Sequence, residues 1–175
     1  MAAVRPALDT DRDDCVAALY EVHRSDGYPV HWPEDPGGWL APPELIATWV
    51  AEHDGRIVGH VALIREDSIP AELRNAAPGR DFAFVARLFV VPRARRLGLA
   101  GDLLTAAAAG ATAAGLVPGL IVVADSGGAI ALYERAGWRR LTSGPGGWTT
   151  AAGTPAWVHF YLAPDSYLRT METTS

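Results

Sequence analysis

The segment that begins at Leu88 constrains the fold most, because it joins a buried strand to a helix through a short basic turn. Its residues read LFVVPRARRLGLAGDLL. Small residues at Gly98, Ala100 and Gly101 allow close approach to the main chain, and the neighbouring arginines add positive charge. The turn and the first free amides of a helix beginning near Gly98 therefore predict a site for a phosphate group.

Two other phosphate-binding loops do not match this segment. The nucleotide triphosphatase loop needs G-x-x-x-x-G-K-[ST], and the chain contains no lysine. A dinucleotide-binding fold needs G-x-G-x-x-G after its first strand, whereas this turn lies in mid-chain and has Arg96 where that pattern has glycine. Taken alone, the segment could also be an ordinary strand-to-helix loop.

A second pattern lies downstream, in the segment DSGGAIALYERAGW that begins at Asp125. Ala129 and Tyr133 are four positions apart and share one face of a helix that Ser126 caps. Together with Arg95-x-x-Gly98-x-Ala100, this order resembles the signatures of the GCN5-related N-acetyltransferase (GNAT) family. Ser126 stands where the family commonly has asparagine, and the resemblance covers about residues 82–141.

The resemblance implies an α/β fold with one domain over residues 1–175. It further implies a mixed central β-sheet flanked by helices, with splayed central parallel strands, and acetyl-coenzyme A (acetyl-CoA) as the cofactor. In the family, the strand before the turn contacts the pantetheine arm through its backbone, and the turn binds the pyrophosphate. The cofactor-binding residues are then expected to be Leu88, Phe89, Val90, Arg95, Arg96, Leu97, Gly98, Leu99, Ala100, Gly101 and Ser126.

By the same resemblance, Tyr133 is expected to be the general acid. A phenol stays protonated at neutral pH and can donate its proton to a departing thiolate. The alternative is a tyrosine packed on the core with its hydroxyl bonded elsewhere. No base is identified, because residues 82–87 and 120–123 contain no carboxylate. The open candidates are a water chain and the side chains of His31, Glu34, His60, Asp81 and His159.

The proline- and glycine-rich segment 25–42 corresponds to the variable loop that walls the acceptor site in the family. Its aromatic and acidic side chains suit a cationic or ring-bearing amine, so Tyr28, Trp32 and Glu34 are expected to bind the acceptor. The alternative is that these aromatic residues only pin the loop to the core.

Arg87 is a charge inside an apolar strand, and we expect it to anchor an acceptor carboxylate. The alternative is a snorkelling or edge position. Residues 143–155, with Trp148, are expected to form the opposite wall of the acceptor site.

Composition limits the other functions. A chain of 175 residues with 49% hydrophobic residues fits one folded domain. A net charge of −5 and dispersed arginines argue against a nucleic-acid partner. The single cysteine, Cys15, excludes an internal disulfide, and no metal site is expected. Without a signal sequence or an apolar run of about twenty residues, we expect a cytoplasmic protein that does not span a membrane.

The sequence therefore predicts an N-acetyltransferase that moves an acetyl group from acetyl-CoA to a primary amine by direct attack in a ternary complex. The acceptor is a small molecule or a peptide, and a homodimer is left open. The alternative function is a non-catalytic acyl-CoA-binding module that senses or scaffolds. The missing carboxylate base favours that module, and Tyr133 favours the enzyme.

Hydrophobic patterning and turn signals predict an alternating order of strands and helices. Asp-Gly at positions 54 and 55 predicts a hairpin, and Thr10 is expected to cap the first helix. Segments 67–80 and 143–155 are expected to be loops, and residues 170–175 to be frayed. Strands are expected at 4–8, 49–52, 56–64, 82–91, 120–124, from 138 and at 157–162, and helices at 10–24, 43–47, 98–114 and from 126.

Overall fold

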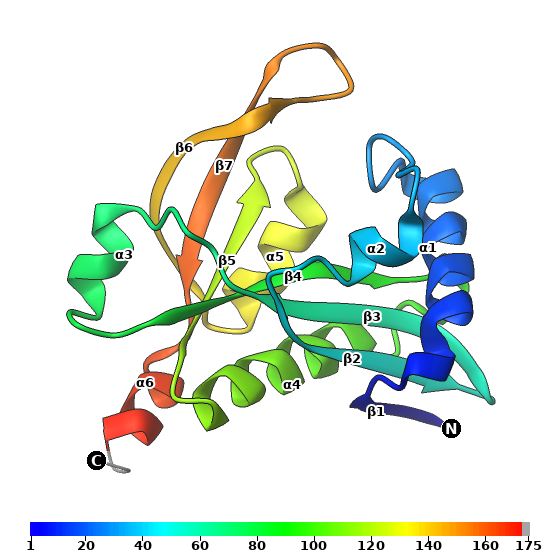
Figure 1. Ribbon diagram of the computed structural model, residues 1–175, viewed down its shortest axis with the longest axis horizontal. Coiled ribbons are helices and arrows are strands. Elements are labelled where there is room, and N and C mark those ends of the chain that lie inside the picture. Colours follow the sequence, from blue (N-terminus) through cyan, green and yellow to red (C-terminus); the bar gives the residue numbers. More distant parts are fainter. Residues whose placement is uncertain (173–175) are drawn as a thin grey trace. The chain divides into compact units, whose positions relative to one another are not determined.

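The structure is a computed structural model that describes residues 1–172 (Figure 1). Its strands form one mixed sheet in the order β1-β2-β3-β4-β5-β7-β6. The strands are β1 Ala2–Pro6, β2 Leu45–His53, β3 Arg56–Ile64, β4 Phe82–Val90, β5 Val117–Val123, β6 Arg139–Thr149 and β7 Pro155–Leu162. The α-helices are α1 Arg12–Asp26, α2 Pro36–Leu40, α3 Ala71–Ala76, α4 Leu99–Ala113, α5 Gly127–Arg135 and α6 Asp165–Glu172, and the 3-10 turns are η1 Asp9–Asp11 and η2 Pro92–Ala94.

The chain forms two compact units. The first comprises Met1–Ile64 and Val85–Ala107, and the second comprises Arg65–Phe84 and the chain from Ala108 onward. The alternating strands and helices of the sequence prediction are thus present, and the mixed sheet with flanking helices is confirmed.

In the first unit, β2 pairs antiparallel with both β1 and β3. The predicted hairpin is confirmed: Asp54 and Gly55 join β2 to β3 with φ angles of 50° and 74°. Two successive left-handed residues match the twist of the paired strands. The first strand ends at Pro6, two residues earlier than expected.

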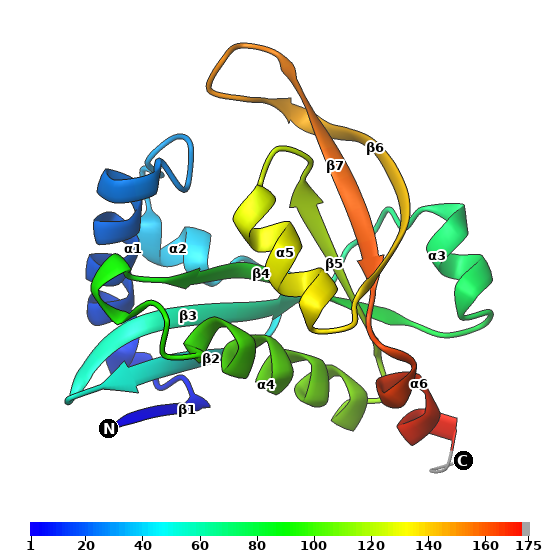
Figure 2. The ribbon, with the colours of Figure 1, turned by 180° about the vertical axis from the view of Figure 1, so that it is seen from behind.

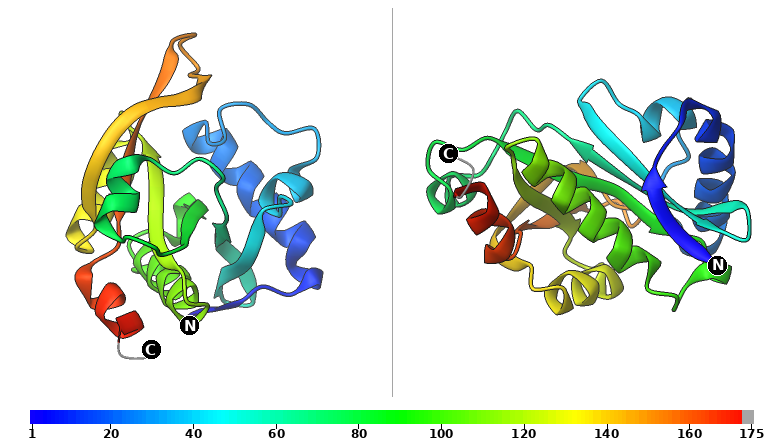
Figure 3. Two further views of the ribbon diagram at one scale, coloured as in Figure 1. Left: turned by 60° about the vertical axis from the view of Figure 1, so that its left-hand side comes forward. Right: turned by 90° about the horizontal axis from the view of Figure 1, so that it is seen from below.

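Helices cover both faces of this part of the sheet. Successive side chains on a strand point to opposite faces, and Gly59 and His60 are neighbours on β3. A Cβ atom on Gly59 would lie 3.0 Å from Leu103 Cδ1 of α4 and 3.1 Å from the Phe89 carbonyl oxygen. His60 instead shares a pocket wall with Cys15 of α1. The first turns of α4 and helix α1 therefore lie on opposite sides of β3 (Figures 2 and 3).

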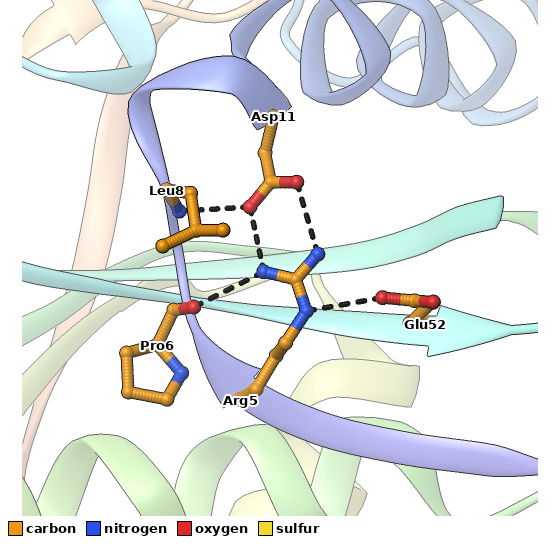
Figure 4. Close-up of polar contacts among 5 residues, drawn as sticks. All are labelled: Arg5, Pro6, Leu8, Asp11 and Glu52. Carbon is orange, nitrogen blue, oxygen red and sulfur yellow. Dashed lines mark hydrogen bonds and ion pairs between the residues drawn. The ribbon is translucent and has the colours of Figure 1, made fainter. Parts of the chain in front are cut away.

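The start of α1 differs from the prediction that Thr10 caps it. Thr10 lies inside the turn η1, and the Asp11 carboxylate accepts a hydrogen bond from the Leu8 amide at 2.8 Å. Arg5 donates to both oxygens of Asp11, at 2.7 and 2.9 Å, and to Glu52 of β2 at 3.0 Å (Figure 4). The pairing with Arg5 makes Asp11 the residue that organises this turn.

The short helix expected at 43–47 was wrong, because β2 begins at Leu45. The helix nearby is α2, inside the proline- and glycine-rich segment 25–42. Asp35 caps it by accepting a hydrogen bond from Gly38 N at 3.0 Å, and Pro36 occupies its first turn. Asp-Pro is a helix-start signal that the glycine-rich composition concealed. The expected loop 67–80 likewise contains the short helix α3.

In the second unit, β7 pairs antiparallel with β5 and β6. The loop expected at 143–155 is shorter, because β6 extends to Thr149 through pairs such as Ser143 with His159. The helix α6 extends to Glu172, so the frayed end expected from residue 170 is helical to that point, and residues 173–175 lie outside the described residues. No helix within residues 1–172 is long and apolar enough to cross a membrane.

Candidate cofactor and acceptor sites

The turn between β4 and α4 exposes its backbone. Arg96 and Gly98 have φ angles of 66° and 77°, and α4 begins at Leu99. A Cβ atom on Gly98 or Gly101 would meet no heavy atom within 4 Å, so a ligand can approach the main chain there. The first helical hydrogen bond runs from Asp102 N to Gly98 O at 3.1 Å, which leaves the preceding amides of the first turn for an anion. These donors fit a pyrophosphate group.

The two arginines of the turn are placed differently. Arg95 donates from Nε to the Val90 carbonyl at 3.1 Å and forms an ion pair with Asp26 near the end of α1. That hydrogen-bonded pair lowers the pKa of the Asp26 carboxyl. Arg96 is exposed, and no hydrogen bond or ion pair links its side chain to other residues in the described range 1–172. Arg95 therefore fastens the turn to α1, while Arg96 is the cation available to a ligand.

The strand before the turn offers its backbone rather than its side chains. Phe89 and Val90 are buried. The Phe89 ring stacks on His60 at 5.3 Å with an interplanar angle of 13°. Leu88 precedes Phe89 in the same strand and is half-buried. Leu97 is exposed in the turn. Any ligand contact by Phe89 and Val90 would thus come from the main chain.

Arg87 adopts a left-handed conformation, with φ 54°, in the middle of β4. Such a backbone costs an ordinary residue about 1–2 kcal/mol, so other contacts must hold it. His60 Nδ1 lies 2.9 Å from the Arg87 carbonyl oxygen. The Arg87 guanidinium lies 4.2 Å over the Trp39 ring, and its Nε donates to the Trp39 carbonyl at 3.3 Å.

His60 is neutral and has a defined tautomer. Burial lowers its pKa to about 4, so the ring carries one proton at neutral pH. Because the partner of Nδ1 is a carbonyl oxygen, which only accepts, Nδ1 carries that proton. His60 is also part of the wall of a pocket of about 640 Å³ in the first unit, together with Cys15, Leu40 and Thr48.

Of the four expected acceptor-binding residues, Tyr28 and Arg87 are brought together. Both contact Trp39: Tyr28 packs edge-on against the ring at 5.8 Å, and Arg87 stacks on it. Tyr28 keeps 36% of its surface exposed, yet burial raises the pKa of its phenol to about 12.

Trp32 packs against α1. The Trp32 ring contacts two side chains of α1, Tyr20 at 5.2 Å and His23 at 5.3 Å. His23 Nδ1 in turn lies 2.7 Å from the Pro29 carbonyl oxygen. Such contacts are expected if the aromatic residues of segment 25–42 only pin the loop to the core, which is the alternative to acceptor binding. Glu34 is exposed on the same segment.

Tyr133 lies in the second unit, on α5. It is buried, and its ring is 6.2 Å from that of Tyr161 on β7. Tyr161 donates from its hydroxyl to Glu134 at 3.0 Å. Ser126 directly precedes α5 as predicted, but its side chain makes no capping hydrogen bond.

The candidate bases are dispersed. His159 lies 2.6 Å from the Ser143 hydroxyl and 3.2 Å from Arg140 Nη1 across the β6–β7 pair. His31 and Asp81 are exposed.

Trp148 is 46% exposed on β6. Burial raises the pKa of the Cys15 thiol to about 12, which makes this cysteine a poor nucleophile.

Comparisons with known proteins agree with this geometry. The family model described as the acetyltransferase (GNAT) family matches residues 12–138. No curated protein matches the sequence significantly. Among solved structures, NAA60 of Arabidopsis thaliana with a bisubstrate analogue is 19% identical, with a TM-score of 0.71 and coverage of 93% of this chain and 98% of that chain.

Two other solved structures share the fold. NAA60 of Arabidopsis thaliana in complex with acetyl-CoA is 20% identical, with a TM-score of 0.70 and coverage of 93% and 97% of the two chains. The ribosomal-protein-S18-alanine N-acetyltransferase of Escherichia coli is 18% identical, with a TM-score of 0.68 and coverage of 93% of each chain. At these identities the likeness establishes the fold.

Proposed function

This chain belongs to the acetyltransferase (GNAT) family, and from that premise we propose that it acetylates a primary amine of a small molecule or peptide. Family membership makes it an acetyltransferase that uses acetyl-CoA. The open backbone of the turn before α4 carries the proposal. When bound, acetyl-CoA supplies an activated thioester, and transfer of its acetyl group to an amine releases a free thiol.

The amides from Arg96 to Gly101 would hold the pyrophosphate, and Arg96 would add a positive charge. The backbone of Leu88, Phe89 and Val90 would bind the pantetheine arm. Arg95 supports this site by fixing the turn to Asp26. Ser126 would contact the cofactor through its backbone, because its side chain is shorter than the asparagine common in the family.

Tyr133 would act as the general acid, with its Oη holding the proton that the departing sulfur takes up. A direct attack by the acceptor is supported by Cys15, whose raised pKa disfavours an acetyl-cysteine route. The amine must lose a proton, and we leave that step to water or to one of the dispersed candidates.

Tyr28 and Arg87 would face the acceptor. The Nε of Arg87 is bound to Trp39; its two terminal nitrogens make no hydrogen bond to the described residues 1–172 and can bind a carboxylate. An acceptor that carries both an amine and a carboxylate, such as an amino acid or a peptide, suits this arrangement. Glu34 stays a prediction for the same site, and so does Trp32, although its contacts with α1 favour the anchoring alternative.

A panel of amines assayed for thiol release and acetylated product tests the proposal. Amino acids and short peptides should be turned over faster than matched amines that lack a carboxylate. Arg87→Gln should remove that preference. If the protein binds acetyl-CoA but turns over no amine above the rate of hydrolysis, the non-catalytic binding module replaces the enzyme.

A further inference from the structure

The left-handed residue in β4 controls more than the direction of its own side chain. In a planar trans peptide, the carbonyl of one residue and the N–H of the next point in opposite directions. The carbonyl of Arg87 and the amide of Leu88 belong to one peptide group. Whatever fixes the carbonyl therefore also fixes the amide.

His60 is the side chain that holds this peptide group. Its Nδ1 lies 2.9 Å from the Arg87 carbonyl oxygen. The imidazole is 2% exposed and stacked on Phe89, which restricts its movement. Since the Arg87 carbonyl points to the His60 imidazole, the N–H of Leu88 points away from that ring.

We propose that His60 is a positioning residue for acetyl transfer: by holding the Arg87 carbonyl, it aims the Leu88 N–H at the oxygen of the acetyl thioester. This inference rests on the proposed function, which puts the backbone at Leu88 beside the cofactor. Negative charge develops on that oxygen during attack, and a donor held in advance stabilises it without reorganisation. His60 touches neither cofactor nor acceptor.

The contacts of the Arg87 side chain act on a different part of the residue. Its stack on Trp39 and its bond to the Trp39 carbonyl orient the guanidinium. They do not hold the peptide group that His60 binds. The effect of His60 should therefore differ from that of Arg87: His60 should change the rate of transfer, and Arg87 the affinity for the acceptor.

The sequence allows a direct test by nuclear magnetic resonance. Arginine is followed by leucine at Leu88, Leu97 and Leu141 alone. Protein labelled with carbonyl-¹³C arginine and ¹⁵N leucine thus gives only these amides in a carbonyl-filtered spectrum. Leu97 lies in the turn and should respond to both acetyl-CoA and coenzyme A. Leu88 should respond much more strongly to acetyl-CoA, because only acetyl-CoA carries the thioester carbonyl.

Three variants separate the roles of His60. His60→Asn keeps a donor close to the place of Nδ1, so the Leu88 response should persist. His60→Leu removes the donor, so Leu88 should respond alike to the two cofactors while Leu97 still responds to both. If His60→Leu does not fold, His60→Gln takes its place, because its amide reaches past the position of Nδ1.

Kinetics give the second readout. His60→Leu should lower kcat by about 10–100-fold, with little change in the affinity for coenzyme A, and His60→Asn should restore most of the rate. Thr48→Val, a change in the same pocket wall, is the control and should keep wild-type kcat.

The outcomes distinguish the two proposals. No response of Leu97 to either cofactor in the wild-type protein would contradict the proposed function itself. If the Leu97 signal responds but the Leu88 signal changes equally with acetyl-CoA and with coenzyme A, the proposed role of the Leu88 amide is overturned. Equal rates for His60→Leu, or for His60→Gln, and the Thr48→Val control would overturn the positioning role of His60.

Discussion

Asp11 should be one of the side chains on which the stability of the first unit depends most. Its carboxylate accepts two hydrogen bonds from Arg5 and one from the Leu8 amide. Removing it in Asp11→Ala leaves the Arg5 guanidinium with Glu52 alone and the Leu8 amide without its acceptor. Asp11→Asn keeps the shape and can still accept from the amide, but it loses the charge.

The structure sets the size of the effect. Hydrogen bonds to charged groups contribute about 1.5–3 kcal/mol when buried. The Arg5 side chain is 34% exposed, so we reduce its bonds to about 1 kcal/mol each. The bond from the Leu8 amide adds about 1 kcal/mol, as a helix cap does. The free energy of unfolding should fall by about 2–4 kcal/mol in Asp11→Ala and by about half as much in Asp11→Asn.

Urea denaturation of both variants and of the neighbouring Asp9→Asn, at several pH values, is the measurement. Asp9 is exposed in the same turn and serves as the control. The Arg5 hydrogen bonds lower the pKa of Asp11. Its contribution is therefore complete above the unfolded pKa of about 3.9 and is lost as the pH falls through the folded value. A loss no larger than that of Asp9→Asn, or one that does not shrink in acid, would refute the reasoning.

Three further predictions concern the ligand sites. Gly98→Glu puts bulk and negative charge at the open turn, so calorimetry should show acetyl-CoA binding weakened at least about tenfold, and unchanged binding would exclude this turn. Tyr133→Phe should lower kcat by about 10²–10⁴-fold with little change in Tm, whereas a large loss of Tm would indicate a structural hydroxyl. Trp32→Ala should lower Tm, because it removes two ring contacts worth about 0.5–1.5 kcal/mol each; a raised acceptor KM at an unchanged Tm would contradict this anchoring role.

Local signals were sufficient for the turns that matter most. Gly98 and Asp54-Gly55 take left-handed conformations where the sequence predicted turns, because glycine and aspartate make such geometry accessible within a few residues. The basic turn, the strand before it and the helix after it are thus confirmed as elements. The ligand contacts of their residues stay predictions.

What the sequence could not supply depends on partners far away in the chain. Residues 143–149 have the glycine and threonine content of a loop, yet pairing with β7 makes them part of β6. The left-handed Arg87 has no local signal, since its carbonyl is held by His60, 27 positions earlier. Burial of an imidazole and pairing across strands are properties of the folded chain, and hydropathy patterns do not encode them.

The ion pairs at the basic turn have a consequence for how the two ligands influence each other. Arg93 pairs with Glu21 at 3.3 Å and Arg95 with Asp26, so the turn is attached to the last half of α1. Past Gly27, the same helix leads directly into the segment that carries Tyr28. Exposed pairs of this kind are weak and screened by salt. Raising the ionic strength should therefore weaken the attachment of the cofactor-binding turn to α1. Any coupling that α1 carries between cofactor binding and acceptor binding is reciprocal, and it should be strongest in dilute buffer.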